Sequence, residues 1–579
     1  MNTLRKLLLL VLASSAIILS LPRCASIGTI SGGDKDTIPP VLLSSTPKMY
    51  QTGFTEKEIK LTFNEYIALK DPAKQFFVSP PLEVKAFPMP KGKSVVVKLE
   101  NLLAANTTYT FGFGNSVVDN NEGNPIKDLQ LVFSTGSRLD TLAVEGYLFD
   151  AYTQKVPENV KVMLYKEEND SLPYLSAPSY YAFPESSGFF RVPNVPAGKY
   201  KLVAVADKND NLRYEQNAEL VGFSSSPIQA KARQPIDTIN RSTGSEKLPE
   251  VRLFLEESVN LTLLEFSRPK ADLLKMVFSK PNPELPKMII PEYSAGDYIV
   301  ESSKNKDTVT FWIINPAIIK KDTIKAMVTY LETGKDRLLE YKSDVLDFYF
   351  KAVAEPKANN KKQPKPAVFN PTFTGITDGV VPATGVLLGF SSPPVSIDPT
   401  KFSLSAKSET DSTKQPFTIE KTSKPLGYSL NVSWKEGSTY FYTILPGAFT
   451  SATGLMNDTI VGRITVAKKE EFGTIVFKVT NLVNPVILQL LTSTGGLYKE
   501  FPLKNSTTLT VDYIPASSYM VRIIYDDNGN LQWDSGNLVK RIQPEMVKIY
   551  KQAGEKGTFV VKKNWENELE IDLKKILNQ

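Results

Sequence analysis

The chain has no histidine and only one cysteine among its 579 residues. Without imidazole it lacks the Ser-His-Asp and Cys-His nucleophiles, histidine metal ligands, and a side chain that titrates near neutral pH when unperturbed. A single cysteine excludes a disulfide framework and a cysteine-based zinc site. Carboxylate-pair catalysis of the glycosidase kind stays open. These absences favour a protein that is not an enzyme.

The net charge is also small, since 62 Asp and Glu residues nearly balance 68 Lys and Arg residues and leave +6. Nucleic-acid binding needs a clustered basic face, and this small, dispersed excess does not predict one. A chain of this length is too long for one hydrophobic core and predicts about three to five domains.

The single cysteine, Cys24, follows a short export-like segment. Arg5 and Lys6 precede an apolar run over residues 7–21, which is the pattern of a secretory signal peptide over residues 1–23. A cysteine at its exit predicts lipidation of Cys24 and a lipid-anchored stalk over residues 24–38. The alternative is an ordinary signal peptide with a leftover buried cysteine, because a lipoprotein site prefers a small residue where Pro22 and Arg23 stand.

The remaining sequence predicts an all-β fold. Forty prolines and 32 glycines are scattered along the chain, which suits short strands joined by turns. Residues 59–67, 94–99 and 108–113 alternate apolar and polar side chains, the period of a half-buried strand. Turn residues at 119–125 separate these strands from the next. We expect an immunoglobulin-like β-sandwich over residues 39–137.

A second β unit is expected over residues 142–225, where Gly188-Phe189-Phe190 precedes Pro196-Ala197-Gly198-Lys199-Tyr200. This order resembles transthyretin-like or carboxypeptidase-regulatory-like β-sandwiches. The other predicted segments are an Ig-like sandwich at 249–353, a linker at 354–366, an Ig-like sandwich at 367–467, a transthyretin-like sandwich at 470–550, and a C-terminal segment at 551–579 that forms a short helix or a frayed tail.

Internal repeats support this order. Residues 386–391 and 437–442 echo residues 59–64 and 106–111 of the first unit. In the fifth unit, residues 513–519 match residues 195–200 of the second. The predicted architecture is therefore a tandem of Ig-like and transthyretin-like sandwiches after an N-terminal signal peptide.

The chain resembles the Ig-like (SbsA-type) domain-containing lipoproteins of Bacteroidota. The resemblance rests on residues 24–28, 36–40, 526–537, 543–545 and 564–565, together with the first sandwich. It implies an exported outer-membrane lipoprotein with non-catalytic β domains, on the periplasmic or the cell-surface face.

Two similar loops place side-chain oxygens at alternate positions and a carboxylate four residues further on. Such spacing can wrap calcium, although neither loop has the glycine or the bidentate glutamate of an EF-hand. The alternative is that the Asp and Asn side chains bond their own backbone in turns, with no cofactor. The candidate ligands are Asp207, Asn209, Asn211 and Glu215 in the first loop, and Asp526, Asn528, Asn530 and Asp534 in the second.

These features predict a non-enzymatic outer-membrane scaffold that is held by its lipid anchor and binds another envelope protein, with no nucleic-acid partner. Two alternatives stay open: a glycan-binding accessory protein and a surface adhesin. Tyrosines at 174, 180 and 181 stack on a sugar or a partner in the glycan hypothesis, and otherwise pack on their own sheet.

Overall fold

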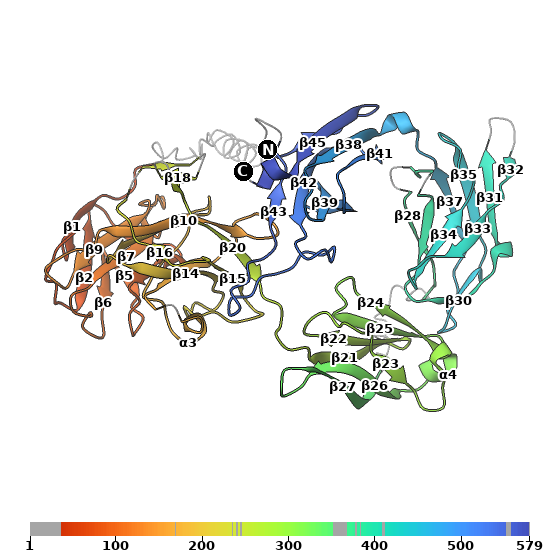
Figure 1. Ribbon diagram of the computed structural model, residues 1–579, viewed down its shortest axis with the longest axis horizontal. Helices are drawn as coiled ribbons and strands as arrows, with labels where there is room; N and C mark the ends of the chain where they lie inside the picture. The colour runs from red at the N-terminus through yellow and green to blue at the C-terminus, as the bar shows by residue number, and fades with distance from the viewer. Residues whose placement is uncertain are drawn as a thin grey trace, which may run out of the picture. The chain divides into compact units, whose positions relative to one another are not determined.

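The computed structural model describes residues 36–167, 169–233, 235–238, 241–243, 246–350, 367–376, 379–382, 384–407, 412–551 and 557–577 (Figure 1). The predicted signal peptide, Cys24 and the 354–366 linker lie outside these residues. The fold is all-β, as expected, and consists of tandem β-sandwich modules. The chain divides into two compact units, Met1–Asp140 and Thr141–Gln579.

The described helices are only four or five residues long: α2 (Pro72–Gln75), α3 (Leu172–Leu175), α4 (Pro316–Ile319) and α5 (Leu573–Leu577). Over the described part of the chain, none of the helices has the length and hydrophobicity that a membrane crossing requires.

Module one is the first compact unit. Its two main sheets have strand orders β1-β2-β6-β5 and β4-β7-β9, and β3 pairs with β8. Phe63 and Val95 of one sheet and Phe111 and Phe133 of the other belong to one buried core, so the sheets pack as a sandwich. The strands are β1 (Leu42–Thr46), β2 (Glu58–Phe63), β3 (Ile67–Leu69), β4 (Phe77–Ser79), β5 (Pro88–Lys91), β6 (Ser94–Lys98), β7 (Thr108–Gly114), β8 (Val117–Asp119) and β9 (Leu129–Ser134).

Module two is built on the sheet path β12-β11-β14-β15-β20-β10-β13, with β16 pairing beside β14. Its core contains Val162, Phe190, Leu202 and Val251, all fully buried. The strands are β10 (Leu142–Asp150), β11 (Val160–Tyr165), β12 (Tyr180–Ala182), β13 (Phe189–Val195), β14 (Lys199–Ala206), β15 (Leu220–Phe223), β16 (Ile228–Gln229) and β20 (Glu250–Leu255). A small sheet precedes β20 and consists of β17 (Ile236–Asp237), β18 (Ser242–Thr243) and β19 (Glu246–Lys247).

Module three packs the sheet β21-β22-β25-β24 on the sheet β23-β26-β27. Phe311 and Ile313 of the first sheet share a buried core with Val328 and Phe348 of the second. The strands are β21 (Leu263–Lys270), β22 (Leu273–Phe278), β23 (Lys287–Ile289), β24 (Tyr298–Ser302), β25 (Thr308–Ile313), β26 (Thr323–Thr333) and β27 (Leu339–Tyr349).

Module four has two four-stranded sheets, β28-β29-β34-β33 and β32-β31-β35-β37, and a β30–β36 pair. Its core joins Leu388 and Leu430 of one sheet to Leu404 and Ile444 of the other. The strands are β28 (Thr372–Thr374), β29 (Val386–Gly389), β30 (Pro394–Ile397), β31 (Phe402–Lys407), β32 (Ser412–Lys414), β33 (Thr418–Lys421), β34 (Gly427–Asn431), β35 (Thr439–Ile444), β36 (Phe449–Ser451) and β37 (Ile460–Thr465).

Module five combines the sheet β41-β38-β45 with the sheet β40-β39-β42-β43, where β44 pairs beside β42. Phe477 and Ile571 on the first sheet and Leu488 and Ile523 on the second are fully buried together. The strands are β38 (Gly473–Thr480), β39 (Val486–Thr492), β40 (Leu497–Leu503), β41 (Thr507–Ile514), β42 (Ser518–Tyr525), β43 (Val547–Ile549), β44 (Phe559–Val560) and β45 (Glu566–Asp572).

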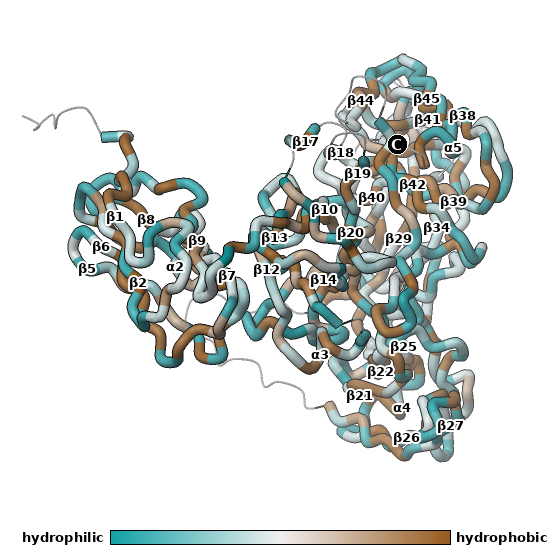
Figure 2. Tube along the Cα trace, turned by 60° about the vertical axis from the view of Figure 1, so that its left-hand side comes forward, coloured by the Kyte–Doolittle hydropathy of each residue, from teal (hydrophilic) through white to brown (hydrophobic). Residues whose placement is uncertain are grey.

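The alternation of hydropathy that predicted these strands is visible along them in Figure 2. In β2, for example, Ile59, Leu61 and Phe63 are buried while Glu58 and Lys60 are exposed. Apolar residues at every second position therefore form the inner face of each sandwich.

Modules two and five each contain the same hydrogen bond at the start of their central strand. The Tyr200 hydroxyl donates to the Pro196 carbonyl oxygen at 2.9 Å, and the Tyr519 hydroxyl donates to the Pro515 carbonyl oxygen at 3.0 Å. The Pro-Ala-X-X-Tyr sequences that revealed the repeat thus form the same corner in both modules.

Two segments differ from the sequence-based expectation. Residues 250–255 were expected in the third unit, but β20 pairs in parallel with β10 and antiparallel with β15 of module two. Residues 566–572 were expected in a short helix or a frayed tail, but β45 pairs in parallel with β38 over seven residues, and only α5 is helical. Parallel partners are distant in sequence and have no local turn signal, so sequence patterns assign such strands to the wrong neighbour.

Candidate functional site

The first Asp/Asn loop follows β14 and closes on its own backbone. Asp207, which is 3% exposed, accepts hydrogen bonds from the backbone N–H groups of Asn211 at 3.2 Å and Leu212 at 2.8 Å. The side-chain amides of Asn209 and Asn211 donate to Glu215 Oε1 at 2.7 and 3.1 Å. All four predicted ligands therefore lie together, held by turn-type hydrogen bonds.

The second loop, after β42, repeats this geometry. Asp526 is completely buried, and its two carboxylate oxygens accept from the N–H groups of Gly529, Asn530 and Leu531 at 2.7, 3.1 and 2.8 Å. The amides of Asn528 and Asn530 both donate to Asp534 Oδ2. The structure again brings together all four predicted ligands of the loop.

Each loop is also held by a buried glutamate that accepts hydrogen bonds from the loop backbone. The sequence analysis missed both glutamates. Glu219 accepts from the N–H groups of Lys208 and Glu215, and Glu545 accepts from those of Asp527 and Asp534. Burial raises the pKa of Glu545, the two N–H donors lower it, and the negative charges of Asp534 and Asp526 raise it further, so the net pKa lies above its usual value. No sequence signal pointed to them, because Glu219 follows Asp207 by 12 residues whereas Glu545 follows Asp526 by 19.

The loops differ in how their negative charge is balanced. In the first, Lys161 Nζ lies 2.8 Å from Asp207 Oδ2 and also pairs with Asp210. Lys161 on β11 pairs in register with Val205, two residues before Asp207. The equivalent residue of module five is Ile487 on β39, which pairs with Ile524, two residues before Asp526. The second loop therefore has no lysine at the equivalent place, and its carboxylates rely on N–H donors.

The geometry does not decide the calcium prediction. Among the residues that the structure describes, no group of three or more Asp, Glu or Cys side chains could hold a metal ion. Asn oxygens also coordinate calcium, so binding at either loop stays a prediction. Lipidation of Cys24 likewise stays a prediction, since that residue lies outside the described part.

Modules two and five are in direct contact, which no sequence pattern indicated. Arg522 on β42 is 6% exposed and lies with its guanidinium carbon 4.1 Å from the centre of the Tyr152 ring. It donates to the Tyr152 carbonyl oxygen at 3.2 Å and to Gln489 Oε1 at 2.7 Å. Trp533 of the second loop packs against the same tyrosine, with ring centres 5.2 Å apart.

The segment after the second loop continues this interface along the end of β20. Glu256, 2% exposed, accepts from the Leu538 N–H at 2.5 Å and from the Tyr214 hydroxyl at 2.8 Å. Burial and the Glu256 charge raise the pKa of Tyr214 far above its usual value, which keeps the phenol protonated as a donor. A Cβ on Gly536 would lie 2.6 Å from Phe254 Cζ, so this close approach requires glycine.

An ion pair closes the same interface at its rim. Arg541 Nε lies 3.0 Å from Asp170 Oδ2, and Lys201 pairs with the same carboxylate at 2.5 Å. Burial raises the pKa of Asp170, but the hydrogen bonds from Arg541 and Lys201 outweigh it and lower the net pKa. Modules two and five are therefore joined by aromatic, buried polar and charged contacts.

The tyrosines considered for sugar binding are mostly packed. Tyr180 and Tyr181 on β12 are 5% and 8% exposed. Tyr174 donates to Glu256 at 3.4 Å and packs on Tyr214. These residues stabilise module two and do not form an exposed platform.

An exposed tryptophan lies elsewhere, in a groove of about 730 Å³ where modules four and five meet. Trp565 is 62% exposed, and the groove also contains Phe472, Glu436, Lys469 and Asp512. Asp512 accepts from the Thr474 hydroxyl at 2.7 Å and pairs with Lys469 at 3.3 Å. This carboxylate is engaged in structural contacts, and the groove presents an indole face beside polar groups.

Comparison with known proteins identifies one module. Residues 36–135 match the family model described as a bacterial Ig-like domain, so module one is a domain of this class. This range covers the first compact unit only, and no curated protein gives a significant match to the chain.

Solved structures resemble the chain only distantly. The N-terminal part of the bacterial S-layer protein SbsC is 13% identical, covering 34% of this chain and 45% of that one, with a TM-score of 0.13. Escherichia coli alpha-2-macroglobulin domains MG0-NIE-MG1 give 10% identity, coverages of 45% and 93%, and a TM-score of 0.18. The Bacillus cereus major pilin subunit BcpA gives 10% identity, coverages of 74% and 98%, and a TM-score of 0.14. The chain thus spans under half the length of the SbsC fragment, and these scores do not show a shared overall arrangement.

Proposed function

We propose that this chain is a non-enzymatic lipoprotein of the bacterial outer membrane, anchored through Cys24, whose β modules form a scaffold for another envelope protein. The observation that carries the proposal is the bonded contact between modules two and five, centred on Tyr152 and Arg522. Two modules that are joined by such a contact present their surfaces in a constant arrangement, as a scaffold requires.

The side-chain chemistry of the protein supports the non-enzymatic part of this proposal. The chain has no histidine, and the buried carboxylates Asp207, Glu256, Asp526 and Glu545 all accept hydrogen bonds from their own modules or from the module interface. These groups stabilise loops and contacts, which favours a structural role for them over general acid or base catalysis.

The anchor is tested by labelling cells with a clickable palmitate analogue. We expect label on the wild-type protein and none on Cys24→Ala, which should move from the membrane to the soluble fraction. Crosslinking of intact cells then identifies the partner, and protease accessibility distinguishes the periplasmic face from the cell surface. A protein that remains unlabelled, or that migrates alone after crosslinking, contradicts the proposal.

The second candidate function is glycan binding at the Trp565 groove. An exposed indole next to carboxylate and hydroxyl groups can stack on a sugar ring and bond its hydroxyls. Binding of neutral oligosaccharides should quench tryptophan fluorescence and be lost in Trp565→Ala. Tyr66→Ala, which removes a 64% exposed aromatic side chain from module one, is the matched control. Equal binding by both variants excludes the groove.

A further inference from the structure

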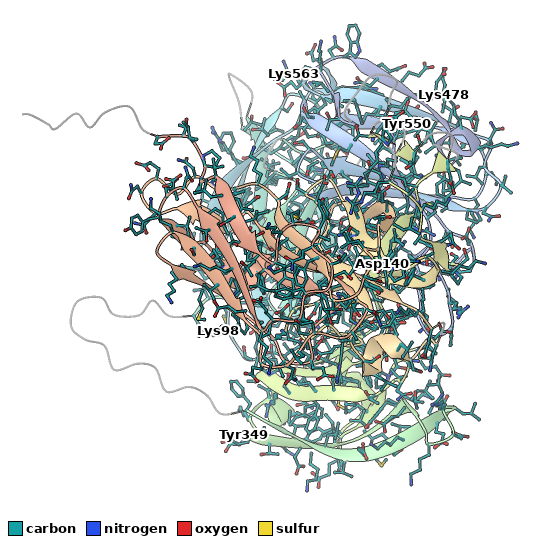
Figure 3. All side chains as sticks on the ribbon, turned by 90° about the vertical axis from the view of Figure 1, so that its left-hand side faces the viewer. Lys98, Asp140, Tyr349, Lys478, Tyr550 and Lys563 are labelled. Carbon is teal, nitrogen blue, oxygen red and sulfur yellow. The ribbon has the colours of Figure 1, made fainter. Side chains whose placement is uncertain are left out.

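The outer strand β27 of module three is long, regular and unpaired on one side. Among the described strands it pairs only with β26, and the eleven paired residues contain no register shift. Figure 1 shows β26 and β27 side by side, and Figure 3 labels Tyr349 at the end of β27. Every second residue of such an edge directs its N–H and C=O groups away from the sheet, where another strand can pair.

One row on the outward face of this sheet is apolar across all three strands, between a row of Lys287, Thr329 and Ser343 and the Lys325–Asp347 ion pair. Ile289 on β23 faces Met327 on β26, which faces Val345 on β27. These side chains are 56%, 42% and 63% exposed. Tyr341, 64% exposed, lies four residues along β27 and borders a hollow of about 360 Å³. Exposed apolar residues in one contiguous row mark an interaction surface more strongly than single ones do.

Natural edge strands avoid pairing with proline, bulges or inward-pointing charge. Residues 339–349 contain no proline, and their register with β26 is unbroken. The charged residues Glu340, Lys342 and Asp344 lie on the same face of the strand as the buried Leu346 and Phe348. Lys342 pairs there with Glu332 at 2.8 Å and with Asp344 at 3.4 Å, so these inward charges neutralise one another within the module. The edge therefore keeps its pairing capacity.

The sequence of β27 is complementary to itself in one antiparallel register. If a two-fold axis passes through Ser343, Lys342 lies opposite Asp344 of a second copy, and Tyr341 lies opposite its Val345. Opposite charges and aromatic–β-branched pairs are the favourable cross-strand combinations. An axis at residue 342 would place lysine against lysine, and an axis at residue 344 would place aspartate against aspartate.

We propose that the chain forms a homodimer in which β27 of each copy pairs antiparallel about Ser343. The two three-stranded sheets of module three then become one six-stranded sheet, and the row of Ile289, Met327 and Val345 in each copy continues onto Tyr341 of the other. This assembly goes beyond the proposed scaffold function, because it concerns association of the chain with itself and does not depend on the lipid anchor.

The test uses the full chain with Cys24→Ala, which removes the only native cysteine. Light scattering coupled to size exclusion should give twice the monomer mass, and Val345→Lys should return it to the monomer mass. Ile289→Lys, on the opposite edge strand of the same sheet, is the matched control and should stay dimeric. Circular dichroism should be unchanged in both variants.

The register is tested separately by disulfide capture. Ser343→Cys in the cysteine-free chain should form a covalent dimer on mild oxidation, because paired positions place Cα atoms within disulfide reach. Thr329→Cys, which faces Ser343 on the inner strand β26, should not crosslink. A wild-type monomer at high concentration, equal loss of the dimer in Ile289→Lys, or equal crosslinking of both cysteine variants would overturn the proposal.

Discussion

The guanidinium of Arg522 stacks on the ring of Tyr152 at 4.1 Å, although the two residues are 370 positions apart in sequence. Burial lowers the pKa of Arg522, but the arginine keeps its charge because an arginine pKa lies so far above neutral pH. A buried cation over an aromatic face is stronger than an exposed one, so this pair is a principal contact between modules two and five.

Arg522→Ala should weaken that contact. The substitution removes the cation–π interaction and leaves the Tyr152 carbonyl oxygen and Gln489 Oε1 without their donor. We expect a loss of about 2 kcal/mol in unfolding free energy, measured by urea denaturation. Arg213→Ala, which removes an exposed arginine from the first loop, is the control and should change little. Equal stability of both variants would show that the stacking is not energetically important.

Glu256→Gln should destabilise the same interface by a different route. The carboxylate uses both oxygens as acceptors, one for Leu538 N–H and the other for the tyrosine hydroxyls. An amide offers only one oxygen and places an N–H against a donor, at a cost of about 1 to 3 kcal/mol. Hydrogen exchange of residues 533–545 should accelerate in this variant. In Glu257→Gln, a change at the exposed neighbouring residue, the exchange of this segment should stay at the wild-type rate.

Calcium titration decides the prediction for the two loops. Lys161 already neutralises Asp207 in the first loop, so a calcium-dependent rise in Tm must come from the second loop. Asp534→Asn should abolish such a rise, whereas Glu215→Gln should leave it intact. Isothermal titration should then give one site per chain. If calcium neither binds nor raises the Tm of the wild-type protein, the loops act as turns alone.

Asp119 in module one should produce stability that depends on acid pH. Burial alone would raise its pKa, but bonds from the N–H groups of residues 121–124 outweigh this and lower it to about 2. The folded state thus binds fewer protons than the unfolded state, for which the ordinary value is 3.8. The stabilisation is complete above the ordinary pKa and is lost as the pH falls through the folded pKa.

Asp119→Asn should remove this dependence. In calorimetry of the full chain, the transition of module one should shift to lower temperature at neutral pH and vary less as the pH falls below about 4. Asp128→Asn changes the net charge equally in the same module and serves as the control. If both variants keep the wild-type acid dependence, Asp119 is not its source.

The sequence predicted those features of the fold that have a local signature. Alternation in residues 59–63 corresponds to β2, and the Pro-Ala-X-X-Tyr repeats form matching corners at Tyr200 and Tyr519. The loop residues at Asp207 and Asp526 were also found, because their spacing is repeated. The roles of Glu219 and Glu545 could not be predicted, since their backbone partners are set by the folded loop.

The contact between modules two and five had no signature of this kind. Tyr214 and Trp533 occupy equivalent positions in the two repeats, but Tyr214 bonds to Glu256 and Trp533 packs on Tyr152. The same position therefore serves module two internally in one repeat and the interface in the other. Sequence similarity shows the equivalence of such positions and not their different partners.

The direct bonding of modules two and five also determines how the chain carries mechanical load. Module two is the first module of the second compact unit, and the C-terminal strand β45 belongs to module five. Tension applied between the two ends of the second compact unit would pass through the Tyr152–Arg522 contact and bypass modules three and four. Those modules would be stretched only after the contact ruptured, which gives the chain a reserve of length under strain.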